Sequence, residues 1–168
     1  MDRRLECKGD KYEIRYAICR DGKSPAVDFL DELAQGAWQE GLDAGDGKLD
    51  QTFAADTFKA LMKRYARRGE LGGKHQINGL GRGIWEFKVG TKRLSFFDTD
   101  GTGGYVERET YRDRDKADRP ESKIWHIPDL DSHIRLADGF PKRGQTTPSR
   151  PINWAHRIRR EDTNHDTN

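Results

Sequence analysis

Apolar and polar residues follow two different periods along the chain. Several short segments alternate apolar and polar positions, which predicts β-strands that turn one face toward a core. Longer segments repeat apolar residues every three to four positions, which predicts helices. Strands are expected at 12–18, 84–89, 92–97 and 133–140, and helices at 25–38, 53–68 and 152–158. Their order predicts an α+β fold, in which an N-terminal strand and a helical hairpin precede antiparallel strands forming a small twisted sheet and a C-terminal helix.

The two central strands form a hairpin that carries cations. Gly90 and Thr91 are expected at its turn, with Lys88 and Arg93 side by side on the adjoining strands. Opposed side chains lie about 5 Å apart in such a pair, so two like charges there need a negative group between them. That group is either the carboxylate of Glu86, in an ion-paired and solvated sheet face, or a bound polyanion. The other face of the first strand is apolar and is expected in the core: Trp85, Phe87 and Val89.

The length of 168 residues suits one ordinary domain. The hydrophobic fraction of 33% lies below the charged fraction of 36%, which indicates a small core with long solvated segments. We expect a single domain over 1–160, with an insertion over 101–131 before the last strand, and a polar tail over 161–168 that frays. No apolar run reaches membrane-spanning length and no apolar signal stretch follows the N-terminus, so a cytoplasmic protein without membrane contact is expected.

The net charge of +2 hides a segregation of charge along the chain. In the first block only Lys48 opposes eight acidic residues: Asp28, Asp31, Glu32, Glu40, Asp43, Asp46, Asp50 and Asp56. In the next block only Glu70 and Glu86 oppose ten cations: Lys59, Lys63, Arg64, Arg67, Arg68, Lys74, Arg82, Lys88, Lys92 and Arg93. A solvated helix face explains the cations over 59–68 but not those on the strands. A basic stripe on a nearly neutral protein attracts polyanions such as nucleic acid.

Four sequence features occur in the order that they have in a known family. They are Trp85-Glu86-Phe87-Lys88, Arg93 on the next strand, Gly139-Phe140-Pro141-Lys142-Arg143, and Ala155-His156-Arg157. Through these features the chain resembles the phage-derived, HigB-like branch of the RelE toxin superfamily, over residues 12–100 and 132–160. The insertion over 101–131 is not part of the family pattern. Lys88 stands where an Arg is usual, so a point charge replaces a bidentate grip on phosphate.

The resemblance implies a toxin of a type II toxin-antitoxin system. Such a toxin is an mRNA interferase, an endoribonuclease that cuts mRNA on the ribosome and so inhibits translation. The implied partner is a cognate antitoxin of the helix-turn-helix type, and no metal or cofactor is implied. The alternative is a relative of the same fold that binds nucleic acid or protein without catalysis, and a third option is a structural protein whose cations pair with the acidic helix.

Cations held on strands suit metal-independent cleavage of RNA. When the 2'-hydroxyl attacks the adjacent phosphate, the enzyme mainly needs positive charge around the developing dianionic phosphorane. The expected catalytic residues are Lys88, Arg93, Lys142, Arg143 and His75, the last as a group that orients the substrate or moves a proton. The expected nucleic-acid contacts are Lys74, Lys92, Arg108, Tyr111 and Arg112. The insertion is expected to clamp RNA, to bind the antitoxin or to cover the site.

Overall fold

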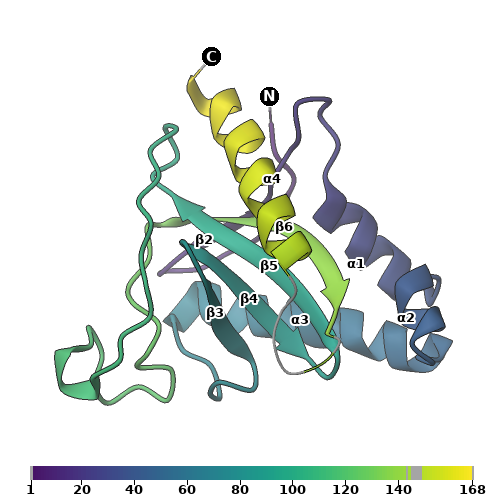
Figure 1. Ribbon diagram of the computed structural model, residues 1–168, viewed down its shortest axis with the longest axis horizontal. Helices are drawn as coiled ribbons and strands as arrows, with labels where there is room; N and C mark the ends of the chain where they lie inside the picture. Colours follow the sequence, from purple (N-terminus) through teal and green to yellow (C-terminus); the bar gives the residue numbers. More distant parts are fainter. Residues whose placement is uncertain (1, 143, 145–148, 168) are drawn as a thin grey trace.

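The computed structural model describes residues 2–142, 144 and 149–167, and within them the chain forms one six-stranded sheet with helices on both faces. In Figure 1, α4 crosses the front of the sheet, whereas α1 and α3 lie behind it. The strands are β1 (Leu5–Lys8), β2 (Glu13–Tyr16), β3 (Ile77–Gly81), β4 (Ile84–Val89), β5 (Lys92–Thr99) and β6 (His133–Pro141). The helices are α1 (Pro25–Gln35), α2 (Gln39–Asp43), α3 (Lys48–Arg68), the 3₁₀ turn η1 (Arg114–Lys116) and α4 (Ser149–Thr167).

The sheet is mixed, with the strand order β1-β2-β6-β5-β4-β3. Neighbouring strands from β6 to β3 are antiparallel, as expected, but β2 pairs with β6 in parallel. A parallel pair needs a long crossover connection, which the segment containing the helices supplies between β2 and the rest of the sheet. The α+β class is therefore confirmed, and the expectation of an antiparallel sheet is corrected at β2.

The expected helical hairpin contains an additional turn. Ser24 caps α1, since its side chain accepts a hydrogen bond from the Val27 N–H, and Gly36 ends the helix with a φ of 69°. The short helix α2 follows, and α3 begins at Lys48, five residues before the expected start. Gln51 on α3 fixes this arrangement, because its side chain accepts from Trp38 N at 2.9 Å and donates to Trp38 O at 3.0 Å.

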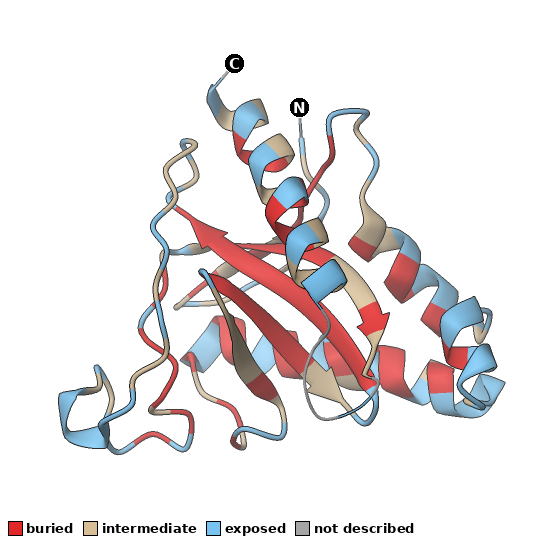
Figure 2. Cartoon of the chain, viewed as in Figure 1, coloured by how far each residue is buried: buried red, intermediate tan, exposed pale blue. Residues whose placement is uncertain are grey.

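Each face of the sheet has its own apolar cluster. On the α3 side, Trp85 and Phe87 of β4 are buried as expected, and Phe87 stacks on Phe96 of β5 with 4.3 Å between ring centroids. Gly139 of β6 lets α1 approach closely, since a Cβ at that position would overlap the ring of Phe29. The α4 side has a smaller cluster that contains Ala17, Cys19, Ile84, Phe97, Ala137, Ala155 and Ile158. Figure 2 shows β4 and β5 buried along most of their length between these two layers.

The segment 101–131 lies along the free edge of the sheet beside β3 (Figure 1). The Tyr105 hydroxyl donates to Arg82 O at 3.0 Å, and Glu109 accepts from the Arg82 N–H at 3.1 Å. Further along, Ile124, Ile127 and Leu130 are buried in the cluster on the α3 side. The segment therefore shields an edge strand that would otherwise offer unpaired backbone groups.

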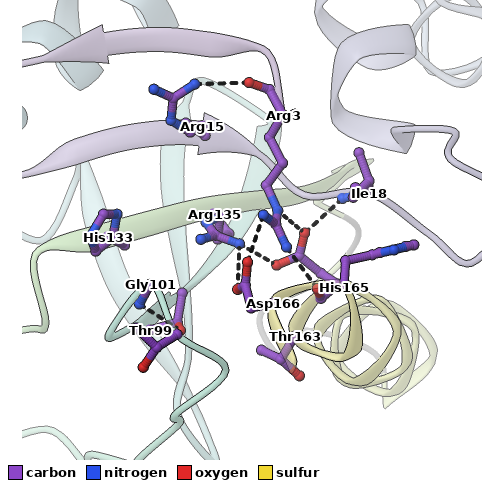
Figure 3. A network of polar contacts seen from close by, with 12 residues as sticks. Arg3, Arg15, Ile18, Thr99, Gly101, His133, Arg135, Thr163, His165 and Asp166 are labelled. Carbon is purple, nitrogen blue, oxygen red and sulfur yellow. Dashed lines mark hydrogen bonds and ion pairs between the residues drawn. The ribbon is translucent and has the colours of Figure 1, made fainter. Parts of the chain in front are cut away.

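The C-terminal residues are helical, which corrects the expected fraying of the tail over 161–167. Asp162 is buried and pairs with Arg3 at 2.7 Å and with Arg135 at 2.8 Å. Asp166 pairs with the same two arginines at 2.8 and 3.3 Å. The Asp162 carboxylate also accepts a hydrogen bond from the Ile18 N–H at 2.9 Å. Figure 3 shows this buried network, which fastens the end of α4 to the sheet and to the N-terminal segment.

Membrane-spanning helices are not found in the part of the chain that the structure describes, since none of its helices is both long and apolar enough.

Candidate functional site

Cationic side chains meet where the β4–β5 hairpin turns. Lys88 and Arg93 are paired across the hairpin, as the alternation predicts, and Gly90 occupies the turn with a φ of 58°. Glu86, two residues before Lys88, faces the same side of the sheet. The Nε of Arg93 lies 3.4 Å from Oε1 of Glu86, so the carboxylate does stand beside the two cations.

Arg93 is held rigidly by the main chain. Its Nη1 donates to Gly90 O at 2.7 Å and to Lys92 O at 3.0 Å, and only 8% of the residue is exposed. These bonds fix the guanidinium beside the turn before any ligand arrives. Because Nη1 of Arg93 already donates to these two carbonyl groups, fewer of its N–H groups are available to a ligand.

The segment before β3 reaches the same place. The Nζ of Lys88 donates to Lys74 O at 2.9 Å, and the Lys88 N–H donates to Gln76 O at 2.9 Å. The side chains of Lys74 and its neighbour His75 are exposed. The structure therefore brings the main chain of Lys74, the residue before His75, next to Lys88, although both belong to a different segment from the hairpin.

Lys142 approaches from the end of β6. Its N–H donates to Thr91 O at 2.6 Å, which joins it to the hairpin turn. Its charge acts on both Glu86 and Lys88. We name Lys88, Arg93 and Lys142 the cationic cluster, with Glu86 as its buried carboxylate. The expected site residue Arg143 lies outside the described residues.

Lys88 and Arg93 bring two positive charges to the one carboxylate of Glu86. Burial raises the pKa of the Glu86 carboxyl, while Arg93, Lys142 and Lys88 pull it down. Burial also lowers the pKa of Lys88, and the charges of Arg93 and Lys142 act in the same direction. Glu86 thus balances only part of the combined charge of Lys88 and Arg93. A dianionic group placed beside Lys88 would relieve the repulsion among them.

Three other expected nucleic-acid contacts have partners elsewhere. Lys92 points to the face of the sheet that carries α3, where it is 5% exposed and pairs with Asp46 at 2.8 Å. Arg108 bridges Asp98 and Asp131 at 2.8 and 3.2 Å, about 17 Å along β5 from Arg93. The Tyr111 hydroxyl donates to Asp118 at 2.7 Å, and Arg112 is exposed on the same segment. These residues are therefore not part of the cationic cluster.

Asp138 is a half-buried carboxyl that sequence patterns did not single out. It lies in a groove of about 860 Å³ between β6, α2 and the start of α4. Burial raises the pKa of Asp138 to about 7, and the charges of Glu40 and Asp28 add to this effect, whereas hydrogen bonds from Gly139 and Trp154 oppose it. The one available signal was an acidic residue within the alternating pattern of β6, and that signal is common at strand ends.

Replacing Asp138 with Asn should make the stability of the protein less dependent on pH. The folded pKa is raised to about 7, so the protonated carboxyl contributes its full stability below pH about 4, and this is lost as the pH rises through about 7. As the pH rises from about 4 to about 7, the free energy of unfolding of the wild type should therefore fall relative to that of the Asn variant, by up to about 4 kcal/mol. Urea unfolding between pH 4 and 8, with Asp115→Asn as an exposed control, measures this difference. An equal difference between Asp138→Asn and wild type at every pH would disprove the assignment.

No protein-family model and no curated protein matches this chain. Within the described residues, no three His, Cys, Asp or Glu side chains gather as ligands for a metal ion.

Proposed function

We propose that this protein is a type II toxin that cleaves mRNA at the cationic cluster without using a metal ion. The observation that carries the proposal is the convergence of Lys88, Arg93 and Lys142 at one end of the sheet, around the buried carboxylate of Glu86. Three segments that are far apart in sequence supply this charge and its rim. Two cations on adjoining strands, Lys88 and Arg93, beside one carboxylate are suited to a phosphodiester that gains charge during the reaction.

The reaction needs little more than positioning and charge. The 2'-oxygen of a ribose attacks the adjacent phosphorus, the bond to the 5'-oxygen breaks, and the products are a 2',3'-cyclic phosphate and a 5'-hydroxyl. The proton of the 2'-hydroxyl leaves and the departing 5'-oxygen gains one. Lys88 and Lys142 would stabilise the negative charge of the phosphorane, and Arg93 would add a positive charge at a fixed position. The exposed His75 is the expected proton carrier.

One observation favours a second candidate, a relative that binds RNA without cutting it. The Nη1 of Arg93 donates hydrogen bonds to two main-chain carbonyl groups, and Glu86 lies within ion-pair distance of the Arg93 Nε. A guanidinium engaged in this way can attract a phosphate but has fewer donors left for the transition state. The same cationic cluster would then give affinity for RNA and no cleavage.

Induced expression in a bacterial host tests the proposal. Wild type should arrest growth and create new 5' ends in cellular mRNA, whereas Arg93→Ala combined with Lys142→Ala should do neither. The matched control is Lys8→Ala combined with Lys23→Ala, which removes the same charge from exposed positions on β1 and before α1. The control should behave as wild type.

The nuclease proposal would be disproved if folded wild-type protein were present in the cells but growth continued and no new mRNA ends appeared. RNA binding that depends on the cationic cluster would then identify the protein as the non-catalytic relative. Such binding should weaken steeply with added salt, because phosphate contacts release counterions.

A further inference from the structure

The outward face of α3 carries apolar side chains that the described chain leaves uncovered. Leu49 and Phe53 are 82% and 72% exposed, more than any other large apolar residue that the structure describes. They are four residues apart and so lie together on the helix surface. Phe58 and Met62 face the other way and are fully buried against the sheet. Single exposed apolar residues are ordinary, but two neighbours on the outward face of the first two turns of α3 form a contact surface.

The same helix face changes its charge along its length. The residues that follow its outward side are all exposed: Leu49, Phe53, Asp56, Ala60, Arg64 and Arg67. Asp50 and Asp56 lie in the first half, and the exposed cations of the second half are Lys59, Lys63, Arg64, Arg67 and Arg68. Neither these acids nor these cations form an ion pair with another described residue (Figure 2 shows the exposed positions on α3). The face is therefore apolar and acidic first, and basic afterwards.

We infer that two copies of this chain pair through α3, with the two helices antiparallel about a two-fold axis midway between Asp56 and Ala60. This arrangement lays the apolar and acidic half of each helix on the basic half of the other. Phe53 then faces the partner's Lys63, whose ammonium can lie over the ring, and the stem of the partner's Arg67 covers Leu49. Asp50 lies within reach of the same arginine. A parallel pair would instead place acid against acid and cation against cation, which is repulsive.

The size and position of α3 determine what kind of dimer this is. The helix has 21 residues and is about 31 Å long. One helix pair of this length buries less than about 1,200 Å², the size of weak and transient interfaces. The cationic cluster is on the opposite face of the sheet from α3, the face that carries α4, so both copies keep it accessible (Figure 1). The inference therefore stands apart from the proposed function.

Sedimentation velocity over about 1 to 500 µM protein tests the pairing, because a transient interface gives a mass that rises with concentration. Wild type should approach the mass of a dimer. Phe53→Ser should raise the dissociation constant at least about tenfold, since symmetry removes the contact twice. The control is Val106→Ser, which changes another exposed apolar residue, 55% exposed and remote from α3 in sequence, and should leave association unchanged. Circular dichroism verifies that each variant is folded.

Charge reversal tests the antiparallel orientation. Asp50→Arg alone and Arg67→Asp alone should each weaken self-association, because each places like charges opposite one another twice. An equal mixture of the two variants should form heterodimers that restore both ion pairs. A wild type that stays monomeric at the highest concentration would overturn the inference. So would a dimer that Phe53→Ser and the single charge reversals leave intact, or one that Val106→Ser weakens as strongly.

Discussion

Lys88→Ala is expected to lower the rate of mRNA cleavage by about two to three decades, equivalent to about 3 to 4 kcal/mol of transition-state stabilisation. Lys88 is half-buried, fixed by its bond to Lys74 O, and flanked by the charges of Arg93 and Lys142. A phosphorane beside it would meet a cation that needs no rearrangement. The measurement is the rate at which purified protein cuts mRNA in a translating extract, under conditions of excess protein.

Two further variants separate charge from side-chain shape. Lys88→Arg keeps the charge and should retain most of the rate, because a guanidinium can also grip phosphate. Lys8→Ala removes an exposed lysine on β1 and should have no effect. Equal rates for Lys88→Ala and wild type would show that the cationic cluster is not the catalytic site. An equal loss of cleavage rate in Lys88→Ala and Lys8→Ala would indicate that the rate depends only on the net charge of the protein.

Asp162→Ala is expected to destabilise the fold by about 3–5 kcal/mol, the range for breaking a buried ion pair by removing one partner. Asp162 is fully buried, and among the described residues its loss would leave Arg3 and Arg135 with Asp166 as their remaining ion-pair partner. The Ile18 N–H would also lose its acceptor. Urea unfolding followed by circular dichroism measures the change in the free energy of unfolding.

Asp115 provides the matched comparison for this substitution. Its side chain is exposed in η1, and Asp115→Ala should change stability by less than about 0.5 kcal/mol. The account of the buried network would be contradicted if Asp162→Ala cost less than about 1 kcal/mol. The end of α4 should lose protection against hydrogen exchange in Asp162→Ala before the sheet does.

The hairpin was predictable from the sequence because its contacts are local. Alternation placed Lys88 and Arg93 on one face and Trp85 and Phe87 on the other, and the turn at Gly90 then fixed the register. The position of Glu86 beside Arg93 follows from the same pattern. Lys142 could be placed near them only through the family resemblance, since no local pattern joins the end of β6 to this turn.

The remaining parts of the fold depend on long-range pairing that a local pattern does not contain. β3 contains Gly79 and Gly81 and ends at a bulge, so it lacks the β-branched and apolar run that marks a strand. The parallel pairing of β2 with β6 joins residues more than 100 positions apart. The ordered end of α4 depends on Arg3, at the opposite end of the chain.

Two of the expected nucleic-acid contacts, Lys92 and Arg108, have acidic partners in the fold. Lys92 and Arg93 both follow the turn, but the pleat directs Lys92 to the face that carries α3, where it forms an ion pair with Asp46. Arg108 is in the insertion, and it anchors that segment to Asp98 of β5. Sequence shows which residues are charged, whereas burial and pairing decide which charges remain for a ligand.

The chemical nature of the RNA ends tests the central claim most directly. Cellular mRNA should be recovered after brief induction of wild type and of Lys88→Ala, and the termini at each new break should be identified. Attack by the 2'-hydroxyl predicts 2',3'-cyclic or 3'-phosphate ends paired with 5'-hydroxyl ends, present with wild type and lost with Lys88→Ala. Breaks that carry 5'-phosphate and 3'-hydroxyl ends, or breaks equally abundant with both proteins, would contradict cleavage at the cationic cluster.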